Sequence, residues 1–420
     1  MKKNIPTAIP IFLASFIFII STQYSSADNA LEVDQRAFHE RLNTVDTHVD
    51  IPRNYATPLV DATLQSRLQV DIPKMKKGGL DTAFFVVYVD QSYRNSWEYD
   101  AVKKAALSKF NAIHRMVERS SGDIELAYSV ADARESVVVQ KVAFIGIENG
   151  FAIGQDLDLL GDYFDLGARY MTLVHNGHND IGDSAQPANR FGDTKTEHNG
   201  LSEFGKKTVA EMNRLGMMVD ISHASKKTMM DATLLSKSPV IASHSSAGAL
   251  VDHPRNLDDE QLELIRRNGG VVQVTAVDEF LVNQSSDIWP AIERVRAALG
   301  LSEEYMELVV PEDIYKQYLS SLKNEIATNY PRANVSDFVD HIDYIVEKIG
   351  VDHVGISSDF DGGGGIIGWD NASQTPNVTY ELVRRGYSES DIKKIWGDNL
   401  LRVLSENEIV SRHLKDSPKL

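Results

Sequence analysis

The sequence predicts an α/β fold of the (β/α)8 TIM barrel type, and three observations support this prediction. Short apolar runs alternate with segments of helical pattern, which is typical of βαβ units around a parallel sheet. Eight such runs occur in a chain of 420 residues, which fits one closed barrel. Polar residues suited to catalysis follow six of the runs, and in a barrel the strand ends converge on one mouth. A doubly wound open sheet is the alternative, but it would scatter these residues along an edge.

The eight predicted strands are short apolar runs bounded by polar clusters. In chain order they are residues 43–47, 82–89, 143–147, 170–174, 218–221, 240–243, 271–275 and 354–357.

Segments with helical periodicity separate these strands. They are residues 98–119, 202–215, 225–234, 258–267 and 335–349. Residues 278–334, between the seventh and eighth strands, are rich in aromatic and acidic residues. We expect them to form a helical excursion that serves as a lid or a dimer arm.

The first 27 residues are predicted to be a cleaved export signal. Two lysines at the start precede a mostly apolar run at residues 8–20, and SSA at positions 25–27 is a small-x-small cleavage pattern. A transmembrane anchor is the alternative, but the apolar run is short for a bilayer span. Residues 28–420 are therefore predicted to form a single catalytic domain that is periplasmic or secreted and has no stable membrane anchor.

Composition narrows the possible partners. The chain has 60 Asp and Glu against 43 Lys and Arg, a formal net charge of −17. Such an acidic surface argues against nucleic acid and anionic lipid as partners. The chain has no cysteine, so an exported protein of this sequence uses no disulfides.

Five residues at predicted strand ends could bind metal. His48 and Asp50 lie two residues apart, so on a strand both side chains point to one face and could reach one ion. Glu148 ends the third predicted strand, His223 follows the fifth and His244 follows the sixth. Imidazole and carboxylate ligands suit zinc and also manganese, cobalt or iron. Because five protein ligands exceed the usual set for one catalytic zinc, we expect two metal ions that share a bridging carboxylate and a bridging hydroxide.

Each of these residues also has a structural interpretation. A single histidine after a strand is more often a hydrogen-bonded loop residue than a ligand, and Glu148 could be a neighbour of a helix N-cap. The recurrence of histidine at several strand ends favours metal binding, because loop histidines have no reason to follow that pattern. Asp46 and Asp220 are interpreted as structural residues that could orient a neighbouring ligand.

Seven motifs, which span essentially the whole mature chain, resemble in their order those of a known family. They read DTHVD, IEN, TLVH, DISHAS, SHSSA, RNLDD and SDFDG. The set resembles the membrane dipeptidase (renal dipeptidase) family of zinc metallopeptidases in the amidohydrolase superfamily, and the HxD of the first motif is its most specific element. The resemblance implies a (β/α)8 barrel with two Zn²⁺ ions that cleaves dipeptides, often with a D-residue at the C-terminal position, and that forms a homodimer.

The resemblance also implies which residues bind the metal ions. His48 and Asp50 would bind the first zinc, His223 and His244 the second, and Glu148 would bridge the two.

Three further residues would act on the substrate according to this resemblance. His175 would contact the scissile carbonyl and stabilise the tetrahedral intermediate. Arg255 would pair with the free carboxylate of the substrate, for which a guanidinium is suited. Asp359 would take a proton from the bridging hydroxide and pass it to the leaving amine. These roles together form a hydrolytic reaction.

Several positions depart from the usual motifs of the family. Thr47 stands where glycine is usual, and a β-branched residue lacks the freedom of glycine to adopt positive φ, so the local geometry could differ. Val49 replaces the usual asparagine, and Asn149 stands where glycine is usual. Residues 176–180 are closer to bacterial relatives than to the mammalian enzymes, and His178 among them is interpreted as a loop residue, with a further substrate contact as the alternative.

Two other functions stay open from the sequence. An N-acyl amino acid hydrolase or a lactonase could use the same binuclear site, and Arg255 discriminates because a neutral lactone has no carboxylate to bind. A non-catalytic binding protein is disfavoured, because it needs no proton shuttle such as Asp359. The function that the sequence favours is an exported, metal-dependent dipeptidase whose partners are small dipeptide substrates.

Overall fold

The computed structural model describes residues 34–283, 289–301 and 312–416. Contacts divide the chain into Met1–Leu42, in which residues 34–39 are helical, and Asn43–Leu420, which contains the sheet. The predicted export signal at residues 1–27 lies outside the described residues. Within the described ranges, no helix combines the length and the hydropathy needed to cross a bilayer.

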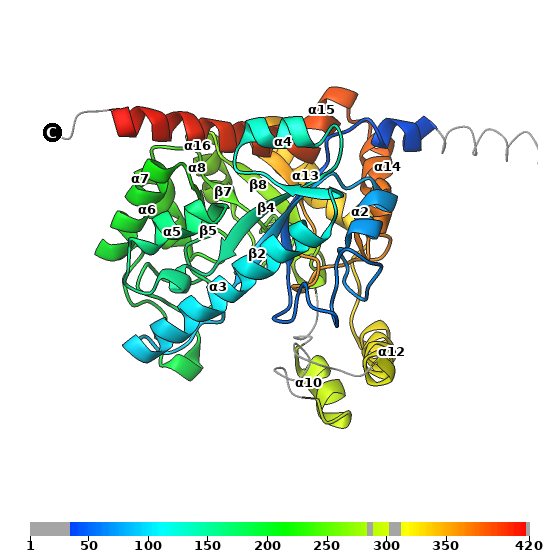
Figure 1. Cartoon of the computed structure of the whole chain (residues 1–420), viewed down its shortest axis with the longest axis horizontal. Coiled ribbons are helices and arrows are strands. Elements are labelled where there is room, and N and C mark those ends of the chain that lie inside the picture. Colours follow the sequence, from blue (N-terminus) through cyan, green and yellow to red (C-terminus); the bar gives the residue numbers. More distant parts are fainter. Residues whose placement is uncertain (1–33, 284–288, 302–311, 417–420) are drawn as a thin grey trace, which may run out of the picture. The chain divides into compact units, whose positions relative to one another are not determined.

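A parallel sheet of eight successive strands lies at the centre of Asn43–Leu420, with helices around it (Figure 1). The strands are β1 (Val45–Asp50), β2 (Thr82–Tyr88), β4 (Lys141–Glu148), β5 (Ala168–Thr172), β6 (Met218–Asp220), β7 (Ile241–Ala242), β8 (Val271–Thr275) and β9 (Val354–Ser357). The sheet nearly closes on itself, because Asp50 N donates to Phe360 O at 2.9 Å and Asp359 N donates to His48 O at 3.1 Å. The predicted (β/α)8 barrel is confirmed, and each predicted strand has its counterpart.

One strand has no counterpart in the sequence prediction. β3 (Ile124–Leu126) pairs in parallel with the first half of β4, from Ile124 opposite Lys141 to Leu126 opposite Ala143. It is three residues long, with one exposed residue between two buried ones, so its pattern is too short to recognise. Because β3 lies off the barrel path, the order of the eight main strands is unaffected.

Helices follow most of the strands. They are α2 (Ile72–Gly78), α3 (Ser96–Arg119), α4 (Val130–Ser136), α5 (Leu159–Asp165), α6 (Glu203–Leu215), α7 (Lys226–Leu235), α8 (Asp259–Asn268), α13 (Val335–Ile349), α14 (Pro376–Arg384), α15 (Glu389–Lys393) and α16 (Asn399–Asp416). The five predicted helical segments correspond to α3, α6, α7, α8 and α13. Each of these five begins with a side chain that accepts a hydrogen bond from the first turn, and the caps are Asn95, Ser202, Ser225, Asp258 and Asn334.

The segment between β8 and α13 contains α9 (Asp278–Leu281), α10 (Trp289–Ala298) and α12 (Glu312–Asn329) in its described parts. At its base, the Asp278 carboxylate accepts hydrogen bonds from Arg332 Nε at 2.7 Å and from Ala333 N at 2.9 Å. The two ends of the segment therefore meet. Its use as a lid or a dimer arm stays a prediction.

Aromatic side chains fill the barrel interior near the first strands. The ring centroids of Phe84 and Phe144 lie 4.7 Å apart, and Tyr170 lies 5.4 Å from Phe84. Gly146 leaves room for this packing, because a Cβ there would lie 2.1 Å from the Tyr170 ring. Burial of each ring contributes about 1.5–3 kcal/mol. The packing holds the Tyr170 hydroxyl against Thr47 O at 3.0 Å, one residue before a predicted ligand.

Candidate metal centre

Seven of the eight predicted site residues bring potential ligand atoms together where six strands end. They form three overlapping groups, within each of which the ligand atoms lie within 4.8 Å of one another. The groups are His48, Glu148 and His244; Glu148, His175 and His223; and His48, Asp50 and Asp359. The eighth residue, Arg255, reaches the cluster from the loop before α8 and donates from Nη2 to His244 O at 3.2 Å.

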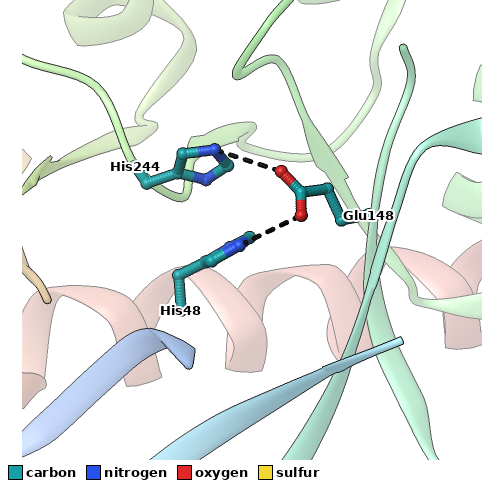
Figure 2. Close-up of side chains that lie close together, drawn as sticks. All are labelled: His48, Glu148 and His244. Atoms are coloured by element: carbon teal, nitrogen blue, oxygen red, sulfur yellow. Dashed lines mark ion pairs between the residues drawn. The ribbon is translucent and has the colours of Figure 1, made fainter. Parts of the chain in front are cut away.

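Glu148 lies between the histidines, with its two carboxylate oxygens facing different sides (Figure 2). Oε2 lies 3.4 Å from His48 Nε2. Oε1 lies 3.1 Å from His223 Nε2 and 3.4 Å from His244 Nε2. A carboxylate that presents one oxygen to each side has the geometry of a bridging ligand.

The distances between the ligand atoms do not divide the ligands between two ions. The Nε2 atoms of His223 and His244 lie 2.9 Å apart, within hydrogen-bond distance, and His48 Nε2 lies 3.5 Å from Asp50 Oδ2. The three groups combine ligands that were predicted to bind different ions, because Glu148 lies near all of the imidazoles. The assignment of each ligand to an ion therefore stays a prediction.

The three predicted imidazole ligands all keep Nε2 toward Glu148 and place Nδ1 against a neutral oxygen. These oxygens are the Tyr170 hydroxyl at 3.1 Å for His48, Asn176 Oδ1 at 3.0 Å for His223, and Ser243 Oγ at 2.8 Å for His244. A proton on Nδ1 leaves the Nε2 lone pair for a metal ion, which is the usual arrangement around a bound metal. His48 Nε2 is also buried without a hydrogen-bond partner among the described residues. The donor set therefore fits a pair of divalent cations.

The charges in the cluster shift the pKa values of its members. Burial alone would lower the pKa of His48, but the carboxylates of Glu148 and Asp50 raise it well above the usual value. Burial would raise the pKa of Glu148, but the imidazoles around it, led by His48, hold that pKa well below the usual value. Burial lowers the pKa of His223 and His244 well below the usual value. These two residues are therefore neutral at pH 7, which is the form that binds metal.

Three site positions have a positive φ. Asn149, His223 and Asp359 have φ of 79°, 62° and 56°. Such conformations cost about 1–3 kcal/mol each and concentrate at functional sites. Asn149, with ψ of 105°, lies outside the αL region, and its side chain is held by accepting from Phe151 N at 3.0 Å and donating to Val89 O at 3.2 Å. Thr47 lies within the extended strand β1, and its hydroxyl donates to Ser243 O at 2.8 Å, so this position does not require glycine.

Arg255 is buried beside the cluster with unused hydrogen-bonding capacity. Its guanidinium carbon lies 5.4 Å from the centroid of the Phe280 ring. Nε and Nη1 of Arg255 have no hydrogen-bond partner among the described residues. Buried donors that lack a partner are costly, so the geometry suits a ligand with a carboxylate.

The sequence did not point to three residues that hold the imidazoles. Ser243 and Asn176 directly follow or precede predicted site residues in the chain, and that adjacency was a usable signal. Tyr170 gave no signal, because an aromatic residue in an apolar strand is indistinguishable from an ordinary core residue.

The loop after His175 is organised by the buried carboxylate of Asp183. Its Oδ1 accepts hydrogen bonds from Glu197 N at 3.0 Å and His198 N at 2.9 Å, and its Oδ2 accepts one from Gly200 N at 3.1 Å. Both ring nitrogens of His178 bond backbone atoms of the same loop, so His178 is a loop residue as predicted.

Replacing Asp183 by asparagine is expected to destabilise the fold by about 1–3 kcal/mol, because an amide NH2 would face a backbone N–H donor. Burial would raise the pKa of Asp183, but the three backbone N–H groups hold it below the usual value. Its contribution to stability is therefore present above about pH 4 and is lost as the pH falls. Urea unfolding of the wild type and of Asp183→Asn at neutral and acidic pH measures the difference in their free energy of unfolding. A difference in stability between them that does not shrink toward low pH would contradict the account.

The model of the membrane dipeptidase family (peptidase family M19) matches residues 33–418. The chain is also similar to fungal sequences named as dipeptidases. Dipeptidase aclJ of Aspergillus oryzae is 33% identical over 357 residues, which cover 83% of this chain and 72% of that protein. Dipeptidase verJ of Clonostachys rogersoniana is 30% identical over 390 residues, which cover 89% of this chain and 86% of that protein.

Solved structures show the same architecture. The probable dipeptidase PvdM from Pseudomonas aeruginosa superposes with a TM-score of 0.78 at 31% identity, covering 91% of this chain and 99% of that one. A structure described as dipeptidase AC, a metallopeptidase of family M19, superposes with a TM-score of 0.67 at 25% identity, covering 87% of this chain and 98% of that one.

Proposed function

The chain belongs to the membrane dipeptidase family, peptidase family M19, and from this premise we propose that it is an exported, zinc-dependent dipeptidase that accepts dipeptides with a C-terminal D-amino acid. Dipeptidase activity and a metal site are the properties of the family. Export rests on the signal-like residues 1–27, and the D-residue preference rests on the resemblance of the motifs. The observation that carries the proposal is Glu148, whose two oxygens face His48 on one side and His223 and His244 on the other.

Two zinc ions, when bound by these residues, would supply a hydroxide nucleophile at neutral pH and polarise the scissile carbonyl. His175 stands on the open side of the cluster, where its Nε2 lies 3.6 Å from Glu148 Oε1 and its side chain is 19% exposed. Burial lowers the pKa of His175. A neutral imidazole at this place can donate a hydrogen bond to the oxygen of a substrate carbonyl.

Arg255 would fix the C-terminal carboxylate of the dipeptide through its buried guanidinium, in which Nε and Nη1 have no partner among the described residues. Burial lowers the pKa of Arg255 to about 10, so the guanidinium keeps its charge at neutral pH. A carboxylate ligand would give one of these donors a partner, and Nη2 on the same edge of the guanidinium could complete the bidentate geometry that arginine favours. This arrangement selects substrates with a free carboxyl group near the bond that is cleaved.

Asp359 would carry the proton from the nucleophile to the leaving amine. Among the groups of the protein itself, burial raises the pKa of Asp359 well above its usual value, and the carboxylates of Asp50 and Glu148 add to this. A carboxyl group with a raised pKa can both accept and return a proton. Its Oδ1 lies 3.8 Å from His48 Nε2, within reach of the metal-binding cluster.

The alternative is an N-acyl amino acid hydrolase or a lactonase on the same site. An N-acyl amino acid also has a carboxylate for Arg255, whereas a neutral lactone does not. The fungal and bacterial relatives are named as dipeptidases, which supports the dipeptide reading over both alternatives.

The test is hydrolysis of a panel of L,L and L,D dipeptides by the purified protein as isolated, after chelation, and after zinc is restored. We expect activity to fall by at least about 10³-fold on chelation, because the nucleophile depends on the metal, and to return with zinc. The ratio of L,D to L,L turnover measures the stereochemical preference. A folded, zinc-loaded protein that cleaves no dipeptide but hydrolyses N-acyl amino acids or lactones would replace the proposal by the alternative.

A further inference from the structure

Asp220 is a fully buried carboxylate that contacts none of the predicted metal ligands directly. It ends β6, and its Oδ1 accepts hydrogen bonds from Ser222 N at 3.1 Å and Ser243 N at 2.9 Å. Its Oδ2 accepts from the Thr172 hydroxyl at 2.5 Å and from Ser243 Oγ at 2.6 Å. The carboxylate therefore joins the ends of three neighbouring strands, and one of its partners is the residue next to His244.

Ser243 links Asp220 to His244, and the chemistry of the Asp220 carboxylate decides which group donates in each of the two hydrogen bonds. An ionised carboxylate only accepts, so the Ser243 hydroxyl donates its single proton to Asp220 Oδ2 at 2.6 Å in preference to the more distant Ser222 Oγ at 3.4 Å. Ser243 Oγ lies 2.8 Å from His244 Nδ1 and has only lone pairs left for that contact. The proton between them must belong to Nδ1, and the lone pair of His244 therefore lies on Nε2, which faces Glu148.

We propose that Asp220 is a positioning residue that, through Ser243, fixes the tautomer and the orientation of His244 so that Nε2 is presented to a metal ion. This inference rests on the proposed function, because it requires the metal centre. A carboxylate behind a metal-binding imidazole makes the imidazole a better ligand, and loss of such a partner weakens metal binding about 10- to 100-fold.

The other two imidazoles are held by neutral groups, which provides an internal comparison. His48 Nδ1 contacts the Tyr170 hydroxyl, which donates in turn to Thr47 O at 3.0 Å. His223 Nδ1 contacts the exposed side chain of Asn176 at 3.0 Å. The relay from Asp220 through Ser243 thus acts on one half of the centre, and its loss should weaken one metal ion more than the other.

The variant Asp220→Asn tests the direction of the relay with little change in shape. Oδ1 can still accept from the two backbone N–H groups, while the amide NH2 in the place of Oδ2 can donate to Ser243 Oγ. The Ser243 hydroxyl would then turn its proton toward His244 Nδ1. This favours the tautomer with the proton on Nε2, and that proton must be lost before a metal binds.

Three serine variants complete the set. Ser243→Ala removes the relay, and Ser243→Thr restores a hydroxyl at the same place. Ser222→Ala is the matched control, because Ser222 is a buried neighbour whose hydroxyl accepts from His244 N at 3.1 Å and makes only a long 3.4 Å contact with Ser243 Oγ. A purely structural role of these hydroxyls would affect Ser222→Ala and Ser243→Ala alike.

The experiment titrates each apoprotein with Zn²⁺ against a chromogenic chelator, with thermal unfolding of the apoproteins in parallel. We expect one of two Zn²⁺ equivalents to bind about 10- to 100-fold more weakly in Asp220→Asn and Ser243→Ala, and Ser243→Thr and Ser222→Ala to stay close to the wild type. Long-range ¹H–¹⁵N spectra of the apoproteins should show a larger share of His244 protonated on Nδ1 in the wild type than in Asp220→Asn, although an Nε2 proton can be shared with His223 Nε2 at 2.9 Å.

Wild-type binding of both equivalents in Asp220→Asn and Ser243→Ala would overturn the inference. So would equal weakening in Ser222→Ala, or weakening that only follows the loss of apoprotein stability. A wild-type protein that binds no Zn²⁺ and cleaves no dipeptide would refute the proposed function itself, which is a separate result from the ranking of the variants.

Discussion

Replacing Asp359 by asparagine is expected to lower kcat for dipeptide hydrolysis by about 10²- to 10⁴-fold, the range of general acid–base catalysis. The amide can neither take a proton from the nucleophile nor return it to the leaving amine. KM should change little, because Asp359 is not proposed to bind the ground-state substrate. Steady-state kinetics on the best dipeptide of the panel measure both constants.

The control for this prediction must separate proton transfer from metal binding, because Asp359 lies in one of the ligand groups. The metal content of the variant is therefore measured beside its kinetics. Asp361→Asn is the matched variant in the same loop, since Asp361 also has a left-handed backbone and burial raises its pKa to about 7, but its carboxylate accepts from Gln69 N and Val70 N instead of facing the cluster. A similar loss of kcat in both variants, or an unchanged kcat in Asp359→Asn, would remove Asp359 from the proton path.

Replacing Arg255 by methionine is expected to reduce kcat/KM for dipeptides by about 30- to 4,000-fold, which corresponds to the 2–5 kcal/mol lost when one partner of a buried charge pair is removed. The loss should fall mainly on KM, because the clamp holds the carboxylate equally before and during the reaction. The physical reason is that Nε and Nη1 of Arg255 are buried and have no partner among the described residues, so a substrate carboxylate is their natural ligand.

The matched control for Arg255 uses the substrate as well as the protein. A dipeptide amide lacks the free carboxylate. Arg255→Met should therefore reduce kcat/KM far less for the amide than for the parent dipeptide. Arg255→Lys keeps the charge but not the two-pronged geometry, and we expect it to recover only part of the affinity. Equal losses on the dipeptide, its amide and a lactone would refute the assignment of the clamp.

The barrel was predictable because its signals are local. Apolar runs such as residues 82–89 and cap residues such as Asp258 act within a few positions of chain, and the structure shows β2 and α8 there. β3 escaped recognition because three residues carry too little periodicity. Short strands such as β7, which has two residues, were found only because a polar cluster marks their end.

The residues that lie in the candidate site could also be predicted from the sequence, because the C-terminal ends of the strands of a barrel lie close together. Once the strands were placed, the convergence of His48, Glu148 and His244 followed from topology. The departures at Thr47 and Asn149 could not be judged in advance, since the backbone angle at each position depends on the strands around it.

The sequence by itself thus determined the fold class, the order of the strands and the residue types that gather at the mouth, because these depend on periodicity and on position along the chain. Only the tertiary structure decided which atoms face one another. The Tyr170 hydroxyl that holds His48 lies 122 residues from it in the chain, and the Asp220 carboxylate reaches Ser243 across 23 residues. Hydrogen bonds of this kind require positions fixed to a few tenths of an ångström, and such positions arise only when the packed strands bring distant residues together.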